Sequence, residues 1–332
     1  MASLTGQPLP TSSRMATMSD GGPARTAEDV RRLGDQLRSW ARFGRDDELG
    51  TLNLVTAQVR SKALGSVVKG EVFSLSLPID ADGPQPPSSP RANPQHVMTR
   101  TGSDPPSIAG LGAGARYTDD LIILHLQSGT HWDALSHVSY DERMYNDVPA
   151  ERVNTQGAHH AAIDAAHDRF VSRGVLLDVA RLHGLDCLSP THAIQADELQ
   201  AAASQGDVQI QAGDIVLIRT GLAGRWHATG SFGAYHGPHA GVHYSTAAWF
   251  AEHDVAAVAA DNMAVEIMAH RPRMPFHMLA LRDLGMPLGE LWDLEALAES
   301  CALDGQYHFL LSAPPLPVVG AVGAPTAPVV IK

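Results

Sequence analysis

Three residues that could bind a divalent metal lie close together in the chain: His131, Asp133 and His137. They follow an apolar run, Leu121-Ile-Ile-Leu124, which predicts a buried strand. Side chains two positions apart in an extended chain point to the same face, so His131 and Asp133 should project together. His137 can fold back from the following loop. Two imidazoles and a carboxylate that converge in this way suit zinc or manganese.

Histidine pairs alone are weak evidence here, because the chain contains 17 histidines. The prediction rests on the combination of a strand, Gly129-Thr130, the His-x-Asp pair and a third histidine. Gly129 would let the backbone turn or approach an ion closely.

The segment Ser128-Gly-Thr-His-Trp-Asp-Ala-Leu-Ser-His137 resembles the signature of the metal-dependent cyclase family, which includes bacterial kynurenine formamidase, isatin hydrolase and trans-dienelactone hydrolase. The usual pattern of that family is His-x-Gly-Thr-His-x-Asp-x-Pro-x-His. This chain has Gln127 at the position of the first histidine and Leu135 at the position of the proline. An amide oxygen is a weaker ligand than imidazole, so Gln127 predicts one tightly bound metal rather than two.

The resemblance extends to the second half of the chain, where His277 and Glu290 match the family's second histidine and its acidic ligand in order and spacing. From the sequence alone, Glu290 would open a helix over 291–297, where the helix dipole favours a carboxylate by about 0.3–1 kcal/mol. The resemblance implies that His131, Asp133, His137, His277 and Glu290 hold the metal. His137 is either a ligand or the general base, since imidazole titrates near neutral pH.

Several other residues are candidates for substrate contact. Gln127 and Trp132 belong to the central motif, and His239 belongs to a histidine-rich loop, Tyr235–His243. His236 and His243 of the same loop are further candidates.

The periodicity of the chain predicts an alternation of strands and helices. Alternating apolar and polar residues predict a strand at Glu71–Leu77. Apolar runs predict strands at Gly174–Val179, Asp214–Arg219 and Val255–Ala260, and the remaining pattern predicts helices at Ala27–Arg38, Asp197–Ala203 and Ala247–His253. Residues 78–107 predict a functional or disordered loop, and Asn154–His167 predicts a solvated helix. The family implies an α/β architecture, the swivelling β/β/α domain with a mostly buried mixed sheet.

Composition limits the function further. The net charge of −12 argues against a nucleic-acid partner, and no apolar stretch approaches the roughly 20 residues of a membrane span. Two cysteines outside any Cys-x-x-Cys pair predict a reducing cytoplasm. Residues 1–24 predict a disordered tail or an added expression segment, and residues 25–332 predict one catalytic domain.

The expected activity is hydrolysis of an amide, formamide or lactone bond in a small cyclic or aromatic substrate. The resemblance also implies a homodimer or homotetramer. Two alternatives stay open: a metal-dependent lyase or cyclising enzyme that uses the same site, and a metal- or ligand-binding protein without turnover, which Gln127 favours. A serine hydrolase is disfavoured because the chain has no Gly-x-Ser-x-Gly elbow.

Overall fold

A mixed sheet runs through the computed structural model, which describes residues 26–230, 233–268 and 273–332. Within these ranges the sheet has nine strands in the order β1-β17-β15-β9-β11-β13-β14-β6-β16. Neighbouring strands from β9 to β14 are parallel, and the remaining pairs are antiparallel. The bounds are β1 Val72–Ser74, β6 His131–Asp133, β9 Val171–Asp178, β11 Ile215–Arg219, β13 Ala257–Ala260, β14 Leu288–Glu290, β15 His308–Ser312, β16 Gly323–Pro325 and β17 Val329–Ile331.

The central strands β11 and β13 are buried along their whole length, as apolar runs on both faces of a covered strand require. This arrangement confirms the predicted α/β class and the mostly buried mixed sheet. The predicted strand at Glu71–Leu77 is shorter in the structure, where only β1 pairs with β17.

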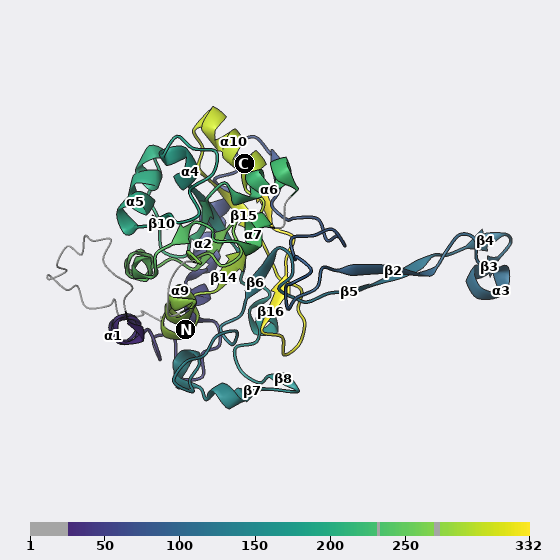
Figure 1. Cartoon of the computed structure of the whole chain (residues 1–332), viewed down its shortest axis with the longest axis horizontal. Coiled ribbons are helices and arrows are strands. Elements are labelled where there is room, and N and C mark those ends of the chain that lie inside the picture. Colours follow the sequence, from purple (N-terminus) through teal and green to yellow (C-terminus); the bar gives the residue numbers. More distant parts are fainter. Residues whose placement is uncertain (1–25, 231–232, 269–272) are drawn as a thin grey trace.

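Helices surround the sheet (Figure 1). The predicted helix after Thr26 is present as α1, where Thr26 and Asp29 form a capping box. Helix α5 packs near β9, and α1 packs against the π-helix η6. The main helical bounds are α1 Ala27–Leu37, α2 Ala57–Leu64, α4 Val179–Leu182, α5 Ala196–Gln205, α6 Leu222–Thr229, α7 Gly233–His236, α8 Ala247–Glu252, α9 Pro275–His277, η6 Met278–Leu284 and α10 Glu295–Asp304.

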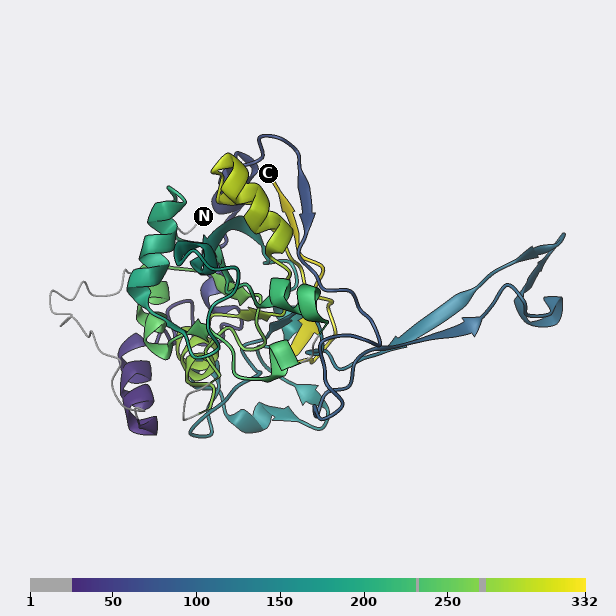
Figure 2. The ribbon, with the colours of Figure 1, turned by 45° about the horizontal axis from the view of Figure 1, so that its top comes forward.

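A long hairpin projects from the body of the molecule (Figures 1 and 2). Its strands are β2, Gln95–Arg100, and β5, Asp119–Ile123, and its tip carries α3 Pro106–Ala109, β3 Gly110–Gly112 and β4 Ala115–Arg116. Leu121, Ile122 and Ile123 are 43%, 44% and 60% exposed. The prediction of a buried strand here was therefore wrong: the run is a strand, but neither face of this two-stranded hairpin is covered within the described chain.

Two other expectations were wrong. Residues 78–107 are not a continuous loop, because they contain β2 and the start of α3. Residues 154–167 form no α-helix: β7 (Val153–Asn154) turns into β8 (Gly157–Ala158), with Gly157 at φ +114°, and a short 3₁₀ helix follows at Ile163–Ala166. A glycine at positive φ favours the turn over a helix.

The predicted tail, residues 1–24, lies outside the described residues. In the part of the chain that is described, no helix has both the length and the apolar character needed to cross a membrane.

Candidate metal centre

Strand register brings three of the predicted ligands together. His131 and Asp133 lie at the two ends of β6 and project to the same face, as their spacing requires. Strand β14 pairs antiparallel with β6 and places Glu290 directly opposite His131. Glu290 is therefore the last residue of a strand, and the expectation that it opens a helix was wrong, because α10 begins only at Glu295.

The ligand atoms of these three residues have the spacing of a small metal shell. His131 Nε2 lies 3.4 Å from Asp133 Oδ1 and 3.5 Å from Glu290 Oε2. Bonds of about 2.0–2.1 Å in a tetrahedral shell place neighbouring ligand atoms about 3.3–3.4 Å apart. His131 Nε2 and Asp133 Oδ1 are also buried without a hydrogen-bond partner. Buried polar atoms are normally satisfied, so this donor set fits a divalent ion.

Two more histidines border the cluster. His277, at the end of α9, places Nε2 3.0 Å from Glu290 Oε1 and 3.7 Å from Asp133 Oδ2. His137 Nε2 lies 3.7 Å from Asp133 Oδ1. The His137 side chain is 17% exposed, whereas those of His131 and Asp133 are fully buried. His137 is therefore the member of the group that is nearest to solvent.

Hydrogen bonds to the Nδ1 atoms orient both inner imidazoles. His131 Nδ1 lies 2.8 Å from the Gly129 carbonyl oxygen, and His277 Nδ1 lies 2.6 Å from Glu266 Oε1. A carbonyl oxygen can only accept, so His131 Nδ1 carries the proton and its Nε2 lone pair faces the cluster. The carboxylate of Glu266 likewise accepts from His277 Nδ1. Burial opposes protonation of His277, but Glu266 and Glu290, one at each ring nitrogen, raise its pKa to about 10.

Glu266 was missed by the sequence analysis. Its carboxylate is buried and also accepts the backbone N–H groups of Phe276 and His277 at 2.9 and 3.0 Å. No motif or period links it to His277 along the chain. Its role is visible only in the structure, where the segment after β13 lies against α9.

The electrostatics of the cluster favour a charged Asp133 and a neutral His137. Burial opposes ionisation of Asp133, but His137 and His131 together hold the pKa of its carboxyl well below the ordinary value. Burial, helped by the nearby His277, lowers the pKa of His137 despite the attraction of Asp133. A neutral imidazole has the free lone pair that a proton acceptor or a metal ligand needs.

Trp132 lies on the opposite face of β6 from the cluster. Its ring stacks on Phe170 at a centroid distance of 4.6 Å and meets Trp292 edge-on at 5.0 Å, and its Nε1 donates to the Ala313 carbonyl oxygen. Trp132 is thus a core residue. The expectation that it contacts substrate was wrong, because alternate residues of a strand face opposite ways.

Gln127 reaches the edge of the cluster. A Cβ atom at Gly323 of β16 would lie 2.8 Å from Gln127 Nε2 and 3.3 Å from Asp133 Oδ1. Both side chains therefore pack over the bare backbone of Gly323, and an alanine there would crowd them. Gln127 Nε2 is buried without a hydrogen-bond partner.

His239 is the member of the histidine-rich loop that is buried close to the acidic groups. Burial lowers its pKa, while Glu290 and Glu266 act on it in the opposite direction. Its Nδ1 contacts the Ala240 carbonyl oxygen at 3.0 Å, and its Nε2 is buried without a partner. His243 instead lies 2.7 Å from Ser245 Oγ, at the start of a 3₁₀ turn.

Comparison with protein families and solved structures places the chain among known proteins. The family model named Cyclase matches residues 73–267, more than half of the chain. A crystal structure of a novel cyclase is 38% identical, covers 90% of this chain and 99% of its own, and superposes with a TM-score of 0.84. Comparison with curated proteins gives no match.

Two more distant structures share the fold. An isatin hydrolase bound to the product analogue thioisatinate is 18% identical, covers 83% of this chain and 99% of its own, and has a TM-score of 0.60. Isatin hydrolase A from Labrenzia aggregata, bound to benzyl benzoate, is 19% identical, covers 82% and 96% of the two chains, and has a TM-score of 0.57. The family match, together with the 38% identical structure, shows that this chain belongs to the cyclase family.

Proposed function

We propose that this protein is a metal-dependent hydrolase that cleaves an amide, formamide or lactone bond in a small cyclic or aromatic substrate. The observation that carries this proposal is the cluster of His131, Asp133 and Glu290, whose ligand atoms converge at tetrahedral spacing and include two buried atoms without partners. Membership in the cyclase family and the shared fold of isatin hydrolases support the type of bond.

His131, Asp133 and Glu290 would hold the metal, and His277 is positioned beside Glu290 as a fourth ligand. This set contains nitrogen and oxygen donors and no sulfur, which suits Mn²⁺ or Zn²⁺. When bound, the ion supplies polarisation of a substrate carbonyl and acidification of water. Gln127 offers only an amide at the remaining family position, so we expect one tight ion, not two, at this cluster.

His137 is positioned to move protons. It is the most exposed member of the cluster, and its lowered pKa keeps the ring neutral near pH 7. In our proposal it accepts a proton from the water that attacks the carbonyl carbon. It then donates that proton to the nitrogen or oxygen that leaves when the C–N or C–O bond breaks.

Gln127 and His239 are proposed to bind the substrate. Each has a buried nitrogen without a hydrogen-bond partner near the cluster, Gln127 Nε2 and His239 Nε2. Such atoms are expensive to leave unsatisfied. Gln127 Nε2 would donate to a carbonyl or carboxylate of the substrate. His239 carries its proton on Nδ1, towards the Ala240 carbonyl oxygen, so its Nε2 would accept from an N–H or O–H of the substrate. The two contacts together would orient the scissile bond.

We also infer that the chain forms a homodimer or homotetramer in the cytoplasm through the projecting hairpin. A two-stranded hairpin is at best marginally stable alone in water. This one exposes apolar side chains along both strands and at its tip, namely Val97, Met98, Ile108, Leu111, Leu121, Ile122 and Ile123. The hairpin projects away from the rest of the chain (Figures 1 and 2). In a dimer with a two-fold axis, each copy would cover the hairpin of the other.

A metal-dependent lyase or cyclising enzyme would use the same residues. A binding protein would hold the metal but would not turn over a substrate.

Removal of the metal tests the proposal. Dialysis against a chelator should abolish hydrolysis of formamides, cyclic amides and unsaturated lactones, and Mn²⁺ or Zn²⁺ should restore it. Full activity in protein shown by elemental analysis to be metal-free would contradict the proposal.

A further inference from the structure

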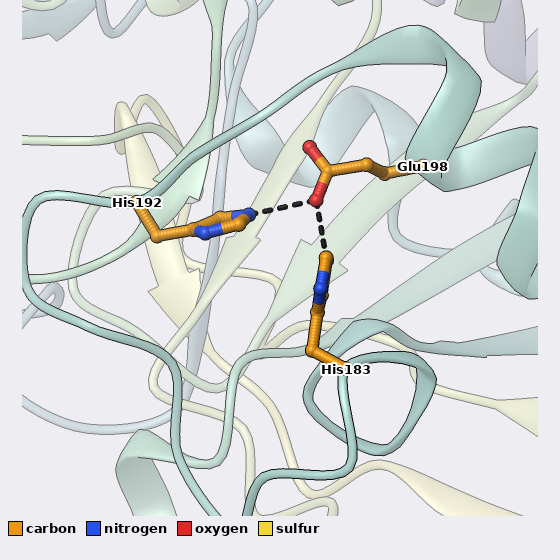
Figure 3. Close-up of side chains that lie close together, drawn as sticks. All are labelled: His183, His192 and Glu198. Atoms are coloured by element: carbon orange, nitrogen blue, oxygen red, sulfur yellow. Dashed lines mark hydrogen bonds and ion pairs between the residues drawn. The ribbon is translucent and has the colours of Figure 1, made fainter.

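A second group of side chains that could hold a metal ion lies near α4 and α5. Strand β9, which precedes α4, is separated from β6 by three strands of the sheet, β11, β13 and β14. His183 follows α4, His192 precedes β10 (Ala193–Ile194), and Glu198 lies in the first turn of α5. Figure 3 shows both imidazoles directed at one carboxylate oxygen. His183 Nε2 and His192 Nε2 lie 2.6 and 2.7 Å from Glu198 Oε1. Three separate segments thus converge on one point.

The two imidazole rings have the mutual placement of ligands on one tetrahedral ion. Their centroids are 5.0 Å apart and their planes are inclined by 67°. Zinc–nitrogen bonds of about 2.0–2.1 Å at a tetrahedral angle would place two Nε2-bound rings with centroids about 5 Å apart. To admit the ion, the nitrogen–oxygen distances must widen to about 3.3 Å. Side chains that are 36% and 27% exposed can make that small movement.

The carboxylate is held in place for this role. Glu198 Oε2 accepts the backbone N–H of Gln195 at 2.8 Å in a capping box, which leaves Oε1 directed at the histidines. Burial opposes its ionisation, but the Gln195 N–H and the two histidines lower the pKa of Glu198 below its usual value. The group is therefore an anionic ligand fixed by the start of a helix.

We propose that His183, His192 and Glu198 bind one zinc ion, with water in the fourth position. Two imidazoles, one carboxylate and a water form a donor set that zinc commonly takes in proteins. The ion would fasten the segment between α4 and α5 to the first turn of α5. In the alternative, the same three residues form only a surface ion pair and bind no zinc.

Zinc titration of the full chain, prepared without a histidine tag, tests the proposal. His192→Gln removes one imidazole, and Glu198→Gln removes the charge but keeps an oxygen for the Gln195 N–H. His227→Gln is the matched control, because His227 pairs at 2.7 Å with a single carboxylate, that of Asp293. We expect both site variants to bind one zinc equivalent fewer than the wild type and the control. Unchanged stoichiometry in Glu198→Gln would overturn the proposal.

Zinc bound at this site can be measured separately from zinc bound at the β6 cluster. In an Asp133→Ala background one zinc equivalent should remain, and adding Glu198→Gln should remove it. Cobalt should give the visible absorption of a tetrahedral ion in the Asp133→Ala protein and lose it in the double variant. If Asp133→Ala alone binds no metal while the wild type binds one equivalent, the second site does not exist and the β6 cluster accounts for all binding.

Discussion

Glu266 decides which nitrogen of His277 faces the β6 cluster. Its Oε1 lies 2.6 Å from His277 Nδ1, while the two backbone N–H groups at the start of α9 hold the carboxylate still. A carboxylate partner of this kind fixes the imidazole tautomer and strengthens the ring as a ligand. We therefore propose that Glu266 influences metal binding through His277.

Glu266→Gln should weaken metal binding without unfolding the protein. The amide keeps a hydrogen-bond acceptor but loses the charge, and loss of such a partner typically costs about 10–100-fold in metal affinity. Competition with a chromophoric chelator measures that affinity. The control is Asp293→Asn, which removes the carboxylate partner of His227 outside the cluster. An unchanged affinity in Glu266→Gln would contradict this role.

Sequence patterns identified the cluster only where local geometry suffices. The two-residue period of a strand predicted that His131 and Asp133 share a face. Glu290 lies opposite His131 because of the register between β14 and β6, and register is a tertiary property that no local pattern contains. For that reason the resemblance found Glu290 while local propensity assigned it to a helix. Glu266 had neither kind of signal.

Asp304 forms ion pairs that connect the end of α10 with Lys332 and Lys69. Asp304, the last residue of α10, accepts Lys332 Nζ at 2.9 Å and Lys69 Nζ at 2.8 Å, and Lys332 follows β17. Burial opposes ionisation, but these two lysines and the Gln306 N–H hold the pKa of Asp304 well below its ordinary value.

These ion pairs should make part of the stability depend on pH. A depressed pKa in the folded state stabilises the fold above the unfolded-state pKa, about 3.9. That contribution is lost as the pH falls below this value toward the folded-state pKa. Asp304→Asn should therefore be less stable than the wild type at pH 7, with the gap narrowing towards pH 3. Urea unfolding at several pH values measures it, with Asp35→Asn on the exposed side of α1 as control. A gap that does not change with pH would contradict the assignment.

At the element scale, the sequence predicts which segments become strands. It does not distinguish strands that are buried in the sheet from a strand of the projecting hairpin. The runs that became β9, β11 and β13 and the run that became β5 are all apolar. Among the residues that the structure describes, other parts of the chain cover only the first three. Hydrophobicity predicts that a segment will be covered, and it does not specify which molecule covers it.

At the scale of the whole molecule, the hairpin of β2 and β5 predicts assembly. Replacing Leu121 and Ile123 with Asp should shift the proposed homo-oligomer towards monomer, because two charges would enter its apolar interface. Sedimentation velocity measures the mass. Leu303→Asp, an exposed apolar position on α10, is the control and should leave the mass unchanged. A wild-type chain that is monomeric at all concentrations, or a variant with unaltered mass, would contradict this inference.

The most direct test of the proposed function compares Asp133→Ala with His137→Ala, measuring metal content and hydrolysis on the same samples. Asp133 is central to the ligand cluster, so Asp133→Ala should lose the metal from the β6 cluster and nearly all turnover. His137→Ala should keep that metal and lose about 10²- to 10⁴-fold in rate, the usual contribution of a positioned acid–base group. A His137→Ala protein without metal would make His137 a ligand. A wild type that holds the metal but hydrolyses none of the formamides, cyclic amides and lactones would contradict the account.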